Sequence, residues 1–381
     1  APDGGGGAAD VSPEALGKYC EEFKGVFLDQ CTRVVPLITN ALKGKKQATR
    51  AQLEAVIFKG GACKRNFAKE RKKKGKRRKT EEGTTRKTKS CSDGGCGVHT
   101  SIHDLVVEGD LSLRSVTQKS MKKKYKGASV PPIIHFIFGM APDFGGKPFA
   151  LIHYLAVKSA HDVMPSATIF LYYTYEPDTE WWRKAKKYCK PIRIDPVKNT
   201  GAWPIDHVAH VADLVRLQAL RDLGGIYMDL DVVTLRPFDS LMSSDYTFIM
   251  GQEGENGVYG LCNAVLMSAP NSSFVDVWID HFSEAYDPNI WSLHSVKLPS
   301  ILGHLYPADL TQVRDKTFFY PLWDNLEHMY AGHGDTFPDN IAMHLWESLA
   351  HDKFISRLNP DYIRNVDNNF NNAVRRFLPA D

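Results

Sequence analysis

Two aspartates separated by a single residue, Asp229 and Asp231, follow a short apolar segment in "GGIYMDLDVVTLRPF" (residues 224–238). Side chains two residues apart in a strand lie on the same face. Neighbouring carboxylates repel one another, and burying them without a cationic partner costs free energy. The pair is therefore predicted either to face water in a turn or to hold a divalent cation, for which carboxylate oxygens are suitable ligands.

Asp213 and Arg216 lie three residues apart in "DHVAHVADLVRLQALRDLGG" (206–225), which has the apolar spacing of an amphipathic helix. Residues at this spacing share one face of a helix. Taken alone, the pair is typical of a surface ion pair that contributes little stability. Its position shortly before the two aspartates makes it a second candidate for ligand contact. Asp206 is the predicted N-cap, and the Gly-Gly pair is the predicted end of the helix.

From residue 128 onward, strand patterns alternate with helix patterns. Alternation of this length predicts an α/β fold, a mostly parallel sheet flanked by helices on both faces. In such sheets ligands bind beyond the carboxyl ends of the strands, where the two aspartates are expected. His135 and His153 lie in apolar patterns and are predicted to be hydrogen-bonded core residues. The predicted strands are 131–139, 167–175, 192–196 and 226–228, and the predicted helices include 147–165 and 206–225.

The chain has 381 residues, 43% of them hydrophobic, which is enough for a sizeable core and for about two units. Residues 1–127 are predicted to form an N-terminal helical and Lys/Arg-rich region that is partly disordered, and residues 128–381 the α/β domain. No run of 18 apolar residues occurs, so no membrane span is expected. Because the chain begins at Ala1, we expect a processed or trimmed form that lacks a targeting or anchoring segment.

The basic character of the chain is concentrated in residues 64–89, which hold 14 Lys and Arg against 3 Glu. The tract is predicted to be a solvated loop. Its charge would also suit an anionic partner such as nucleic acid, anionic lipid or a sulfated glycan. No aromatic residues alternate with the lysines as stacking platforms for bases, so the partner stays unspecified.

One longer motif carries a resemblance to a known family. "HVADLVRLQALRDLGGIYMDLDVVTLRPFD" (210–239) resembles the DXD-containing sugar-transferase region of glycosyltransferase family 32, with the initiating α-mannosyltransferases as members and the α-1,4-galactosyltransferases as close relatives. The shared pattern is A-D-x-x-R followed by G-G-I-Y-x-D-x-D. "VPPIIHFIFG", "LCNAVLMSAPNSSFVDVWIDHF" and "IAMHLWESLA" extend the resemblance over about 130–350. The chain departs from the pattern at Lys297-Leu298-Pro299, where relatives carry Gly-Pro, and at Phe136 and Phe138, where Gln and Trp are common.

The resemblance implies a GT-A-type fold and a metal-dependent, retaining glycosyltransferase. Such an enzyme would move a hexose from a UDP- or GDP-sugar to a glycan, lipid or protein acceptor, and would reside in the secretory pathway, in the Golgi lumen. It implies that Mn²⁺ or Mg²⁺ is bound by Asp231 directly, with Asp229 facing the ribose or a metal-bound water and His344 as a remote ligand or a diphosphate contact. The implied catalytic residues are Asp213, Arg216, Asp229 and Asp231, and the implied donor-binding residues are Phe136, Ile137, Asp213, Arg216, Asp229, Asn263 and Trp346.

Several alternatives stay open at this point. Trp346 would either stack on the donor or fill the core. Glu253 and Glu255, in "GQEGENGVYG", could line the acceptor side, but we predict that they belong to a flexible acidic loop. The chain could also be a catalytically inactive nucleotide-sugar-binding protein, or a protein that binds nucleic acid or another anionic partner through its basic tract.

Overall fold

The computed structural model divides the chain into two compact units, residues 1–92 and 93–381. It describes residues 100–107, 113 and 129–379, except 202, 243 and 244, together with β1 (Ala9–Asp10) and β2 (Gln47–Ala48), which pair antiparallel. Apart from β1, β2 and residues 100–107 and 113, the predicted N-terminal region 1–127, including the basic tract at 64–89, lies outside the described residues. The predicted division at residues 127 and 128 stays a prediction.

A seven-stranded sheet forms the centre of the second unit, in the order β10-β8-β9-β6-β3-β4-β5. Neighbours pair in parallel except at β9, which is antiparallel to both β6 and β8. The predicted fold class, a mostly parallel GT-A-type sheet, is therefore confirmed. The strands are β3 (Ile133–Ile137), β4 (Thr168–Tyr173), β5 (Lys190–Arg193), β6 (Gly225–Met228), β8 (Phe248–Glu253), β9 (Gly260–Ser268) and β10 (Thr311–Val313).

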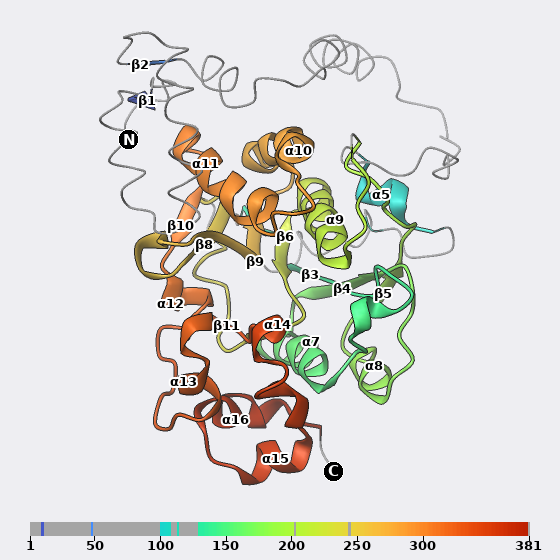
Figure 1. Ribbon diagram of the computed structural model, residues 1–381, viewed down its shortest axis with the longest axis vertical. Coiled ribbons are helices and arrows are strands. Elements are labelled where there is room, and N and C mark those ends of the chain that lie inside the picture. Colours follow the sequence, from blue (N-terminus) through green and yellow to red (C-terminus); the bar gives the residue numbers. More distant parts are fainter. Residues whose placement is uncertain are drawn as a thin grey trace. The chain divides into compact units, whose positions relative to one another are not determined.

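Helices cover both faces of this sheet, as predicted. Figure 1 shows α9, α10 and α11 on one face and α7 and α8 on the other. Their bounds are α7 (Leu151–Val163), α8 (Glu180–Ala185), α9 (Val208–Leu223), α10 (Ser273–Ala285) and α11 (Leu298–Leu305), the last preceded by a π-helical turn at Leu293–Lys297. The predicted helix ranges agree with α7 and α9 to within a few residues, the usual uncertainty at helix ends.

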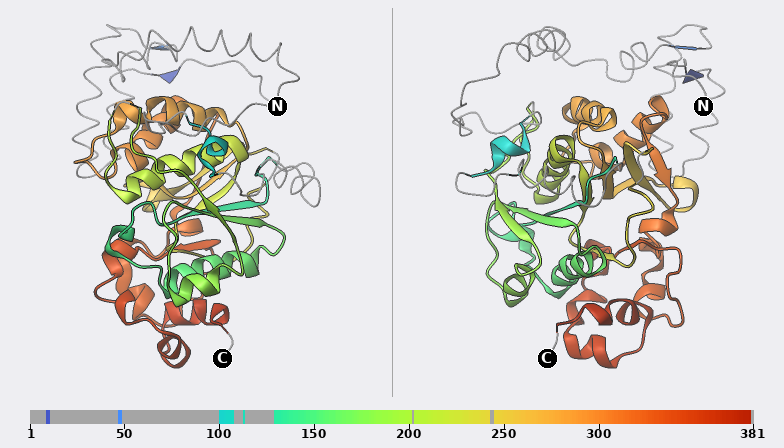
Figure 2. Two further views of the ribbon diagram at one scale, coloured as in Figure 1. Left: turned by 90° about the vertical axis from the view of Figure 1, so that its right-hand side faces the viewer. Right: turned by 180° about the vertical axis from the view of Figure 1, so that it is seen from behind.

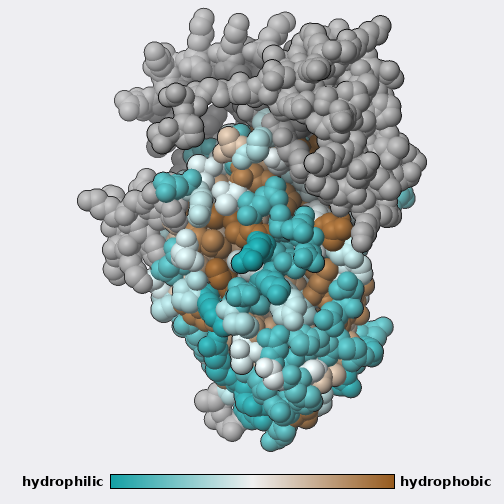
Figure 3. Space-filling model, turned by 90° about the vertical axis from the view of Figure 1, so that its left-hand side faces the viewer, coloured by the Kyte–Doolittle hydropathy of each residue, from teal (hydrophilic) through white to brown (hydrophobic). Residues whose placement is uncertain are grey.

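The C-terminal part adds short helices at one end of the unit. In both views of Figure 2 the last, dark red helices lie at one end of the unit, and this end is mainly hydrophilic in Figure 3, where hydrophobic residues gather nearer the middle of the face. The short helices are α12 (Asp315–Phe318), α13 (Leu326–Tyr330), α14 (Glu347–Ala350), α15 (Pro360–Asn365) and α16 (Asn369–Val374). Two further strands, β7 (Val232–Thr234) and β11 (Ala342–His344), pair antiparallel as a separate ribbon.

The turn from α9 into β6 depends on its two glycines. Gly224 has φ +62° and Gly225 has φ +108°, a region that residues with a Cβ rarely adopt. A Cβ on Gly225 would stand 2.4 Å from the carbonyl oxygen of Ile133. The carbonyl of Gly224 lies 2.7 Å from Nε2 of His135, whose Nδ1 lies 3.1 Å from the Tyr172 hydroxyl. His135 is thus a fully buried, hydrogen-bonded core residue, as predicted.

A short segment ahead of the sheet domain packs against α9. In this segment, α5 (Ile102–Leu105) buries Ile102 and Leu105. The Asp222 carboxylate accepts hydrogen bonds from the Ser101 hydroxyl at 2.7 Å and from the Ile102 N–H at 2.8 Å. Residues 101–107 therefore belong with the second unit. Among the described residues, no helix is both long and apolar enough to cross a membrane.

Candidate active site

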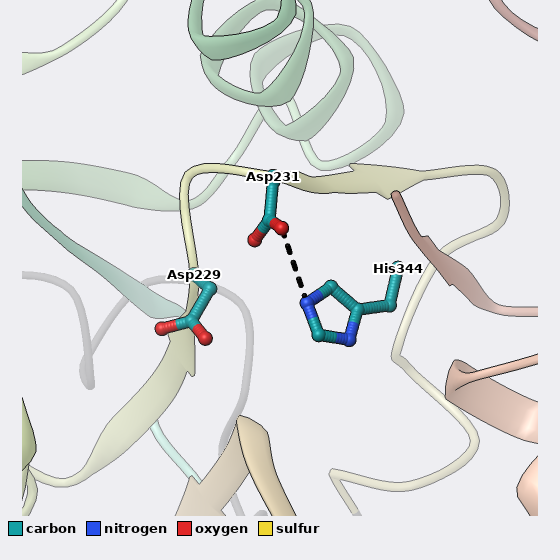
Figure 4. Close-up of side chains that lie close together, drawn as sticks. All are labelled: Asp229, Asp231 and His344. Carbon is teal, nitrogen blue, oxygen red and sulfur yellow. Dashed lines mark ion pairs between the residues drawn. The ribbon is translucent and has the colours of Figure 1, made fainter. Parts of the chain in front are cut away.

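Asp229 and Asp231 lie where β6 ends and β7 begins, at the carboxyl edge of the parallel strands. The buried strand β6 ends at Met228, and a turn closed by the Val232 N–H and the Asp229 carbonyl, 3.0 Å apart, leads into β7. Figure 4 shows both carboxylates on the same side of this turn. The position predicted from the local pattern is confirmed, and the pair is only partly exposed rather than fully in water.

His344 reaches the aspartates from a distant part of the sequence. It ends β11 and pairs with Val232, the residue after Asp231. Its Nε2 lies 3.3 Å from Oδ2 of Asp231 (Figure 4). One ligand atom from each of Asp229, Asp231 and His344 lies within 4.8 Å of the others. Two carboxylates and one imidazole are a donor set for a divalent cation, and the imidazole suits Mn²⁺ better than Mg²⁺.

The two aspartates differ in their tendency to carry charge. Although burial alone would raise the pKa of Asp231, the neighbouring His344 and the Glu347 N–H, which donates to Oδ2 at 2.9 Å, lower it to about 2. Burial raises the pKa of Asp229, and the nearby Asp231 adds to this effect, while the charge of Arg216 opposes it. Asp231 is thus a carboxylate at neutral pH and the better anionic ligand of the two.

Asp229 is also held by two side chains that face it. The Tyr227 hydroxyl donates to Oδ1 at 2.5 Å, and the Arg216 guanidinium lies 3.2 Å from the same oxygen. The guanidinium carbon of Arg216 stands 4.3 Å from the centre of the Tyr227 ring, a cation–π contact. These contacts hold the carboxylate of Asp229 beside Tyr227 and Arg216.

Asp213 and Arg216 form a buried ion pair, so the interpretation as a surface pair is wrong. Asp213 is 6% exposed and Arg216 is 3% exposed, because α9 packs this face on the sheet. The Arg216 guanidinium lies 2.9 Å from Asp213 and donates to the carbonyl of Asn263 at 2.8 Å. Asp213 also accepts from Asn263 Nδ2 at 2.7 Å and lies 2.9 Å from Nε2 of His294. Asp213, Arg216, Asn263 and Asp229 are thus one connected network.

Three other predicted residues lie around this centre differently. Phe136 is fully buried in the hydrophobic core and offers no exposed ring surface to a donor. Ile137, the last residue of β3, is also buried. Trp346 packs its ring 3.9 Å, centre to centre, from the His344 ring and donates from Nε1 to the Pro321 carbonyl at 3.0 Å. Its contact holds the imidazole in place, and its role toward a donor stays a prediction.

The site contains residues that the sequence reasoning missed. Tyr227 had a local signal, because a residue two positions before Asp229 in a strand faces the same side. His294 had none, because it comes from the π-helical turn after α10.

Glu253 ends strand β8 rather than lying in a flexible loop, so that prediction is wrong for this residue. Its carboxylate accepts from Trp323 Nε1 at 3.0 Å, and burial raises its pKa.

Comparisons with known proteins identify the family. Residues 154–248 match the family described as "Glycosyltransferase sugar-binding region containing DXD motif". A protein of Cryptococcus neoformans var. grubii named glucan organizing enzyme 1 is 33% identical over 282 residues, which cover 70% of this chain and 76% of that protein. The chain belongs to the DXD-containing glycosyltransferases. The chain is therefore an enzyme that transfers sugars, and the resemblance of its sequence to the DXD-containing sugar transferases is confirmed.

Solved glycosyltransferases resemble the structure weakly. The galactosyltransferase LgtC, solved with donor and acceptor sugar analogs, is 15% identical with a TM-score of 0.35, covering 56% of this chain and 87% of that chain. GlyE of Streptococcus pneumoniae TIGR4 is 14% identical with a TM-score of 0.38, covering 65% of this chain and 60% of that chain. These scores are low, so the family assignment rests on the sequence matches.

Proposed function

We propose that this glycosyltransferase is metal-dependent and transfers a hexose, with retention of configuration, from a UDP- or GDP-sugar to a glycan, lipid or protein acceptor. The observation that carries the proposal is the convergence of Asp229, Asp231 and His344 within 4.8 Å at the carboxyl edge of the sheet. A divalent cation at this position, Mn²⁺ or Mg²⁺, would neutralise the negative charge of a diphosphate leaving group.

The residues around the cluster are proposed to divide the work. Asp231 and His344 would hold the cation, and Asp229, fixed by Tyr227 and Arg216, would complete the cluster or face the ribose. Asp213 and Arg216 are proposed to hold hydroxyls of the donor sugar. Because both are almost fully buried, their contribution would come through a small part of their surface and through the orientation of Asp229 and Asn263.

The acceptor is the least constrained part of the proposal. The name of the Cryptococcus relative supports a glycan, and within that class a glucan, as the first acceptor to test. Residence in the secretory pathway, in the Golgi lumen, is also proposed, on the strength of the family resemblance. Co-localisation of a tagged full-length protein with a Golgi marker would test it.

The test is nucleotide release from a panel of UDP- and GDP-sugars with Mn²⁺ and then with EDTA. One donor is expected to be hydrolysed slowly. Chelation should abolish the release, and Asp231→Asn should reduce it by about two orders of magnitude or more. The matched control is Asp361→Asn, which changes an exposed aspartate of α15 and should release nucleotide at the unaltered rate.

Two results would overturn the proposal. Release that continues in EDTA would show that the metal is not required. Donor binding without any turnover, with every donor and acceptor of the panel, would identify an inactive nucleotide-sugar-binding protein instead.

A further inference from the structure

One fully buried imidazole is hydrogen-bonded to Asp213 of the candidate active site. His294 is 0% exposed, and its Nε2 lies 2.9 Å from Oδ2 of Asp213. A carboxylate has no hydrogen to give, so Nε2 carries the proton and donates it. Because none of the His294 ring is accessible, the ring cannot touch a substrate. Any influence that it has on catalysis must therefore pass through the residues that it contacts.

The surroundings of His294 are aromatic apart from this hydrogen bond. The centre of its ring lies 5.0 Å from that of Phe282, 5.2 Å from that of Tyr286 and 4.6 Å from that of His210. Within the described part of the chain, its Nδ1 has no hydrogen-bond partner. A buried polar atom without a partner costs free energy, so packing alone would favour phenylalanine at this position. The bond to Asp213 is the contact that only the imidazole makes.

The backbone holds His294 in place through an unusual turn. Residues Leu293–Lys297 form a π-helical turn, in which the Leu298 N–H donates to the carbonyl of Leu293, five residues earlier. Single π-helical turns occur often at functional sites. The indole Nε1 of Trp278, a buried residue of α10, donates to the His294 carbonyl at 2.9 Å. These contacts give the imidazole a fixed position from which to donate to Asp213.

The hydrogen bond from His294 determines which part of the Asp213 carboxylate stays available. Oδ1 accepts from Asn263 Nδ2 at 2.7 Å and lies 2.9 Å from the Arg216 guanidinium, whereas Oδ2 accepts from His294. A carboxylate offers about four acceptor positions, two on each oxygen, so the described residues leave one position on Oδ2. Although burial would raise the pKa of Asp213, the charge of Arg216 and the hydrogen bond from His294 lower it. The remaining position therefore belongs to an ionised carboxylate.

We propose that His294 is a positioning residue for sugar transfer: its Nε2–H holds the Asp213 carboxylate in one orientation and leaves one acceptor position, on Oδ2, for a single hydroxyl of the donor sugar. Without this bond the carboxylate would be held at Oδ1 alone and would be free to turn. A misplacement of about 1 Å can cost about 100-fold in rate. The assignment rests on the proposed function, because it takes Asp213 to hold a hydroxyl of the donor sugar.

Nucleotide release by two variants at residue 294 tests this role. The readout is kcat/KM for the UDP- or GDP-sugar that the unaltered protein hydrolyses with Mn²⁺. His294→Phe keeps an aromatic ring but removes the donor, and should lower kcat/KM by about 10-fold or more, as is typical when a residue that orients a ligating side chain is removed. His294→Gln restores an N–H close to the position of Nε2 and should lose less. Inhibition by free UDP or GDP should be unchanged, because Asp213 is proposed to act on the sugar.

A double-mutant cycle in EDTA and without a donor tests the contact itself. The readout is the midpoint of urea unfolding for His294→Phe, Asp213→Asn and the double variant. His294→Phe should lower the midpoint less in the Asp213→Asn background than in the unaltered protein, because the effects of interacting neighbours are not additive. This measurement does not depend on whether nucleotide sugars are hydrolysed.

The matched control is His328→Phe, which should leave kcat/KM unchanged. Nε2 of His328, on α13, lies 2.8 Å from Oδ2 of Asp335, a pair of the same type outside the candidate active site. Unchanged kcat/KM in His294→Phe, or equal losses in His294→Phe and His294→Gln, would overturn the positioning role. Weaker inhibition by free nucleotide in His294→Phe would also overturn it, since it would indicate a general defect of the site. If the unaltered protein hydrolyses no donor, the proposed function fails, and the cycle decides the inference: non-additive midpoints support it and additive midpoints overturn it.

Discussion

Replacing Arg216 by methionine is expected to lower the free energy of unfolding by about 3–5 kcal/mol, the cost of breaking a buried ion pair by removing one partner. The guanidinium stands 2.9 Å from Asp213, 3.2 Å from Asp229 and 2.8 Å from the Asn263 carbonyl. Methionine retains much of the length and the apolar stem but none of the donors. The almost buried carboxylate of Asp213 and the partly exposed carboxylate of Asp229 would lose their cation at once.

The electrostatic part of this loss can be isolated with a double-mutant cycle. Asp213→Asn removes one of the two charges while keeping an oxygen that can accept from Asn263. We expect Arg216→Met in the Asp213→Asn background to cost less than in the unaltered protein, by about 1–3 kcal/mol, because interacting neighbours are not additive. The assay is urea unfolding at pH 7 and physiological ionic strength, with EDTA present throughout.

Arg183→Met is the matched control for this cycle. Arg183 pairs with Asp178 at 2.6 Å, but both side chains are exposed, so the substitution should cost little. A loss below about 1 kcal/mol for Arg216→Met, with additive effects in the double variant, would refute the reasoning. The pair would then behave as an exposed ion pair despite its burial.

Three further outcomes follow from the packing around the sheet. Gly225→Ala should lower the free energy of unfolding by more than about 3 kcal/mol, because its Cβ would stand 2.4 Å from the Ile133 carbonyl oxygen at a positive φ. The control Gly146→Ala, at φ +78° with nothing within 4 Å of the Cβ, should lower it by about 1–2 kcal/mol. Equal losses of the two variants in urea unfolding would contradict this. Burial lowers the pKa of His135 from 6.5 to about 4, so the unfolded chain binds the proton more tightly and the protein loses up to about 3 kcal/mol as the pH falls from 6.5 to 4. His135→Gln does not titrate, so the stability difference between the two proteins must change over this range, and a constant difference would be the wrong outcome. Asp222→Ala should speed the exchange of backbone amide hydrogens selectively at residues 101–107, because two donors of that segment lose their acceptor. Unchanged exchange there would show that the segment is held by other contacts.

The local patterns in the sequence predicted the parts of the fold that depend on nearby residues. The helix α9, its glycine end and the strand before Asp229 follow from spacing and turn chemistry. The N-cap is His207 rather than Asp206, a shift of one residue, and β5 begins two residues before its predicted start. Both differences lie at element boundaries, where short-range preferences are weakest.

Pairing between distant segments could not be predicted in the same way. The antiparallel strand β9 lies between β6 and β8, and nothing in its own sequence states its direction. The burial of Asp213 and Arg216 depends on the sheet that α9 covers, so their spacing alone indicated a surface pair. His294 joins the site through its tertiary contact with Asp213, for which no local pattern exists.

The ribbon of β7 and β11 has a consequence for when the enzyme can become active. Asp229 and Asp231 precede β7, whereas His344 arrives with β11, 113 residues after Asp231 (344 − 231). Chains are synthesised from the N-terminus, and their domains fold as they emerge. A nascent chain that has already formed β6 holds both carboxylates but has no imidazole to place beside them. The three-residue cluster exists only once β11 has been synthesised and has paired with β7.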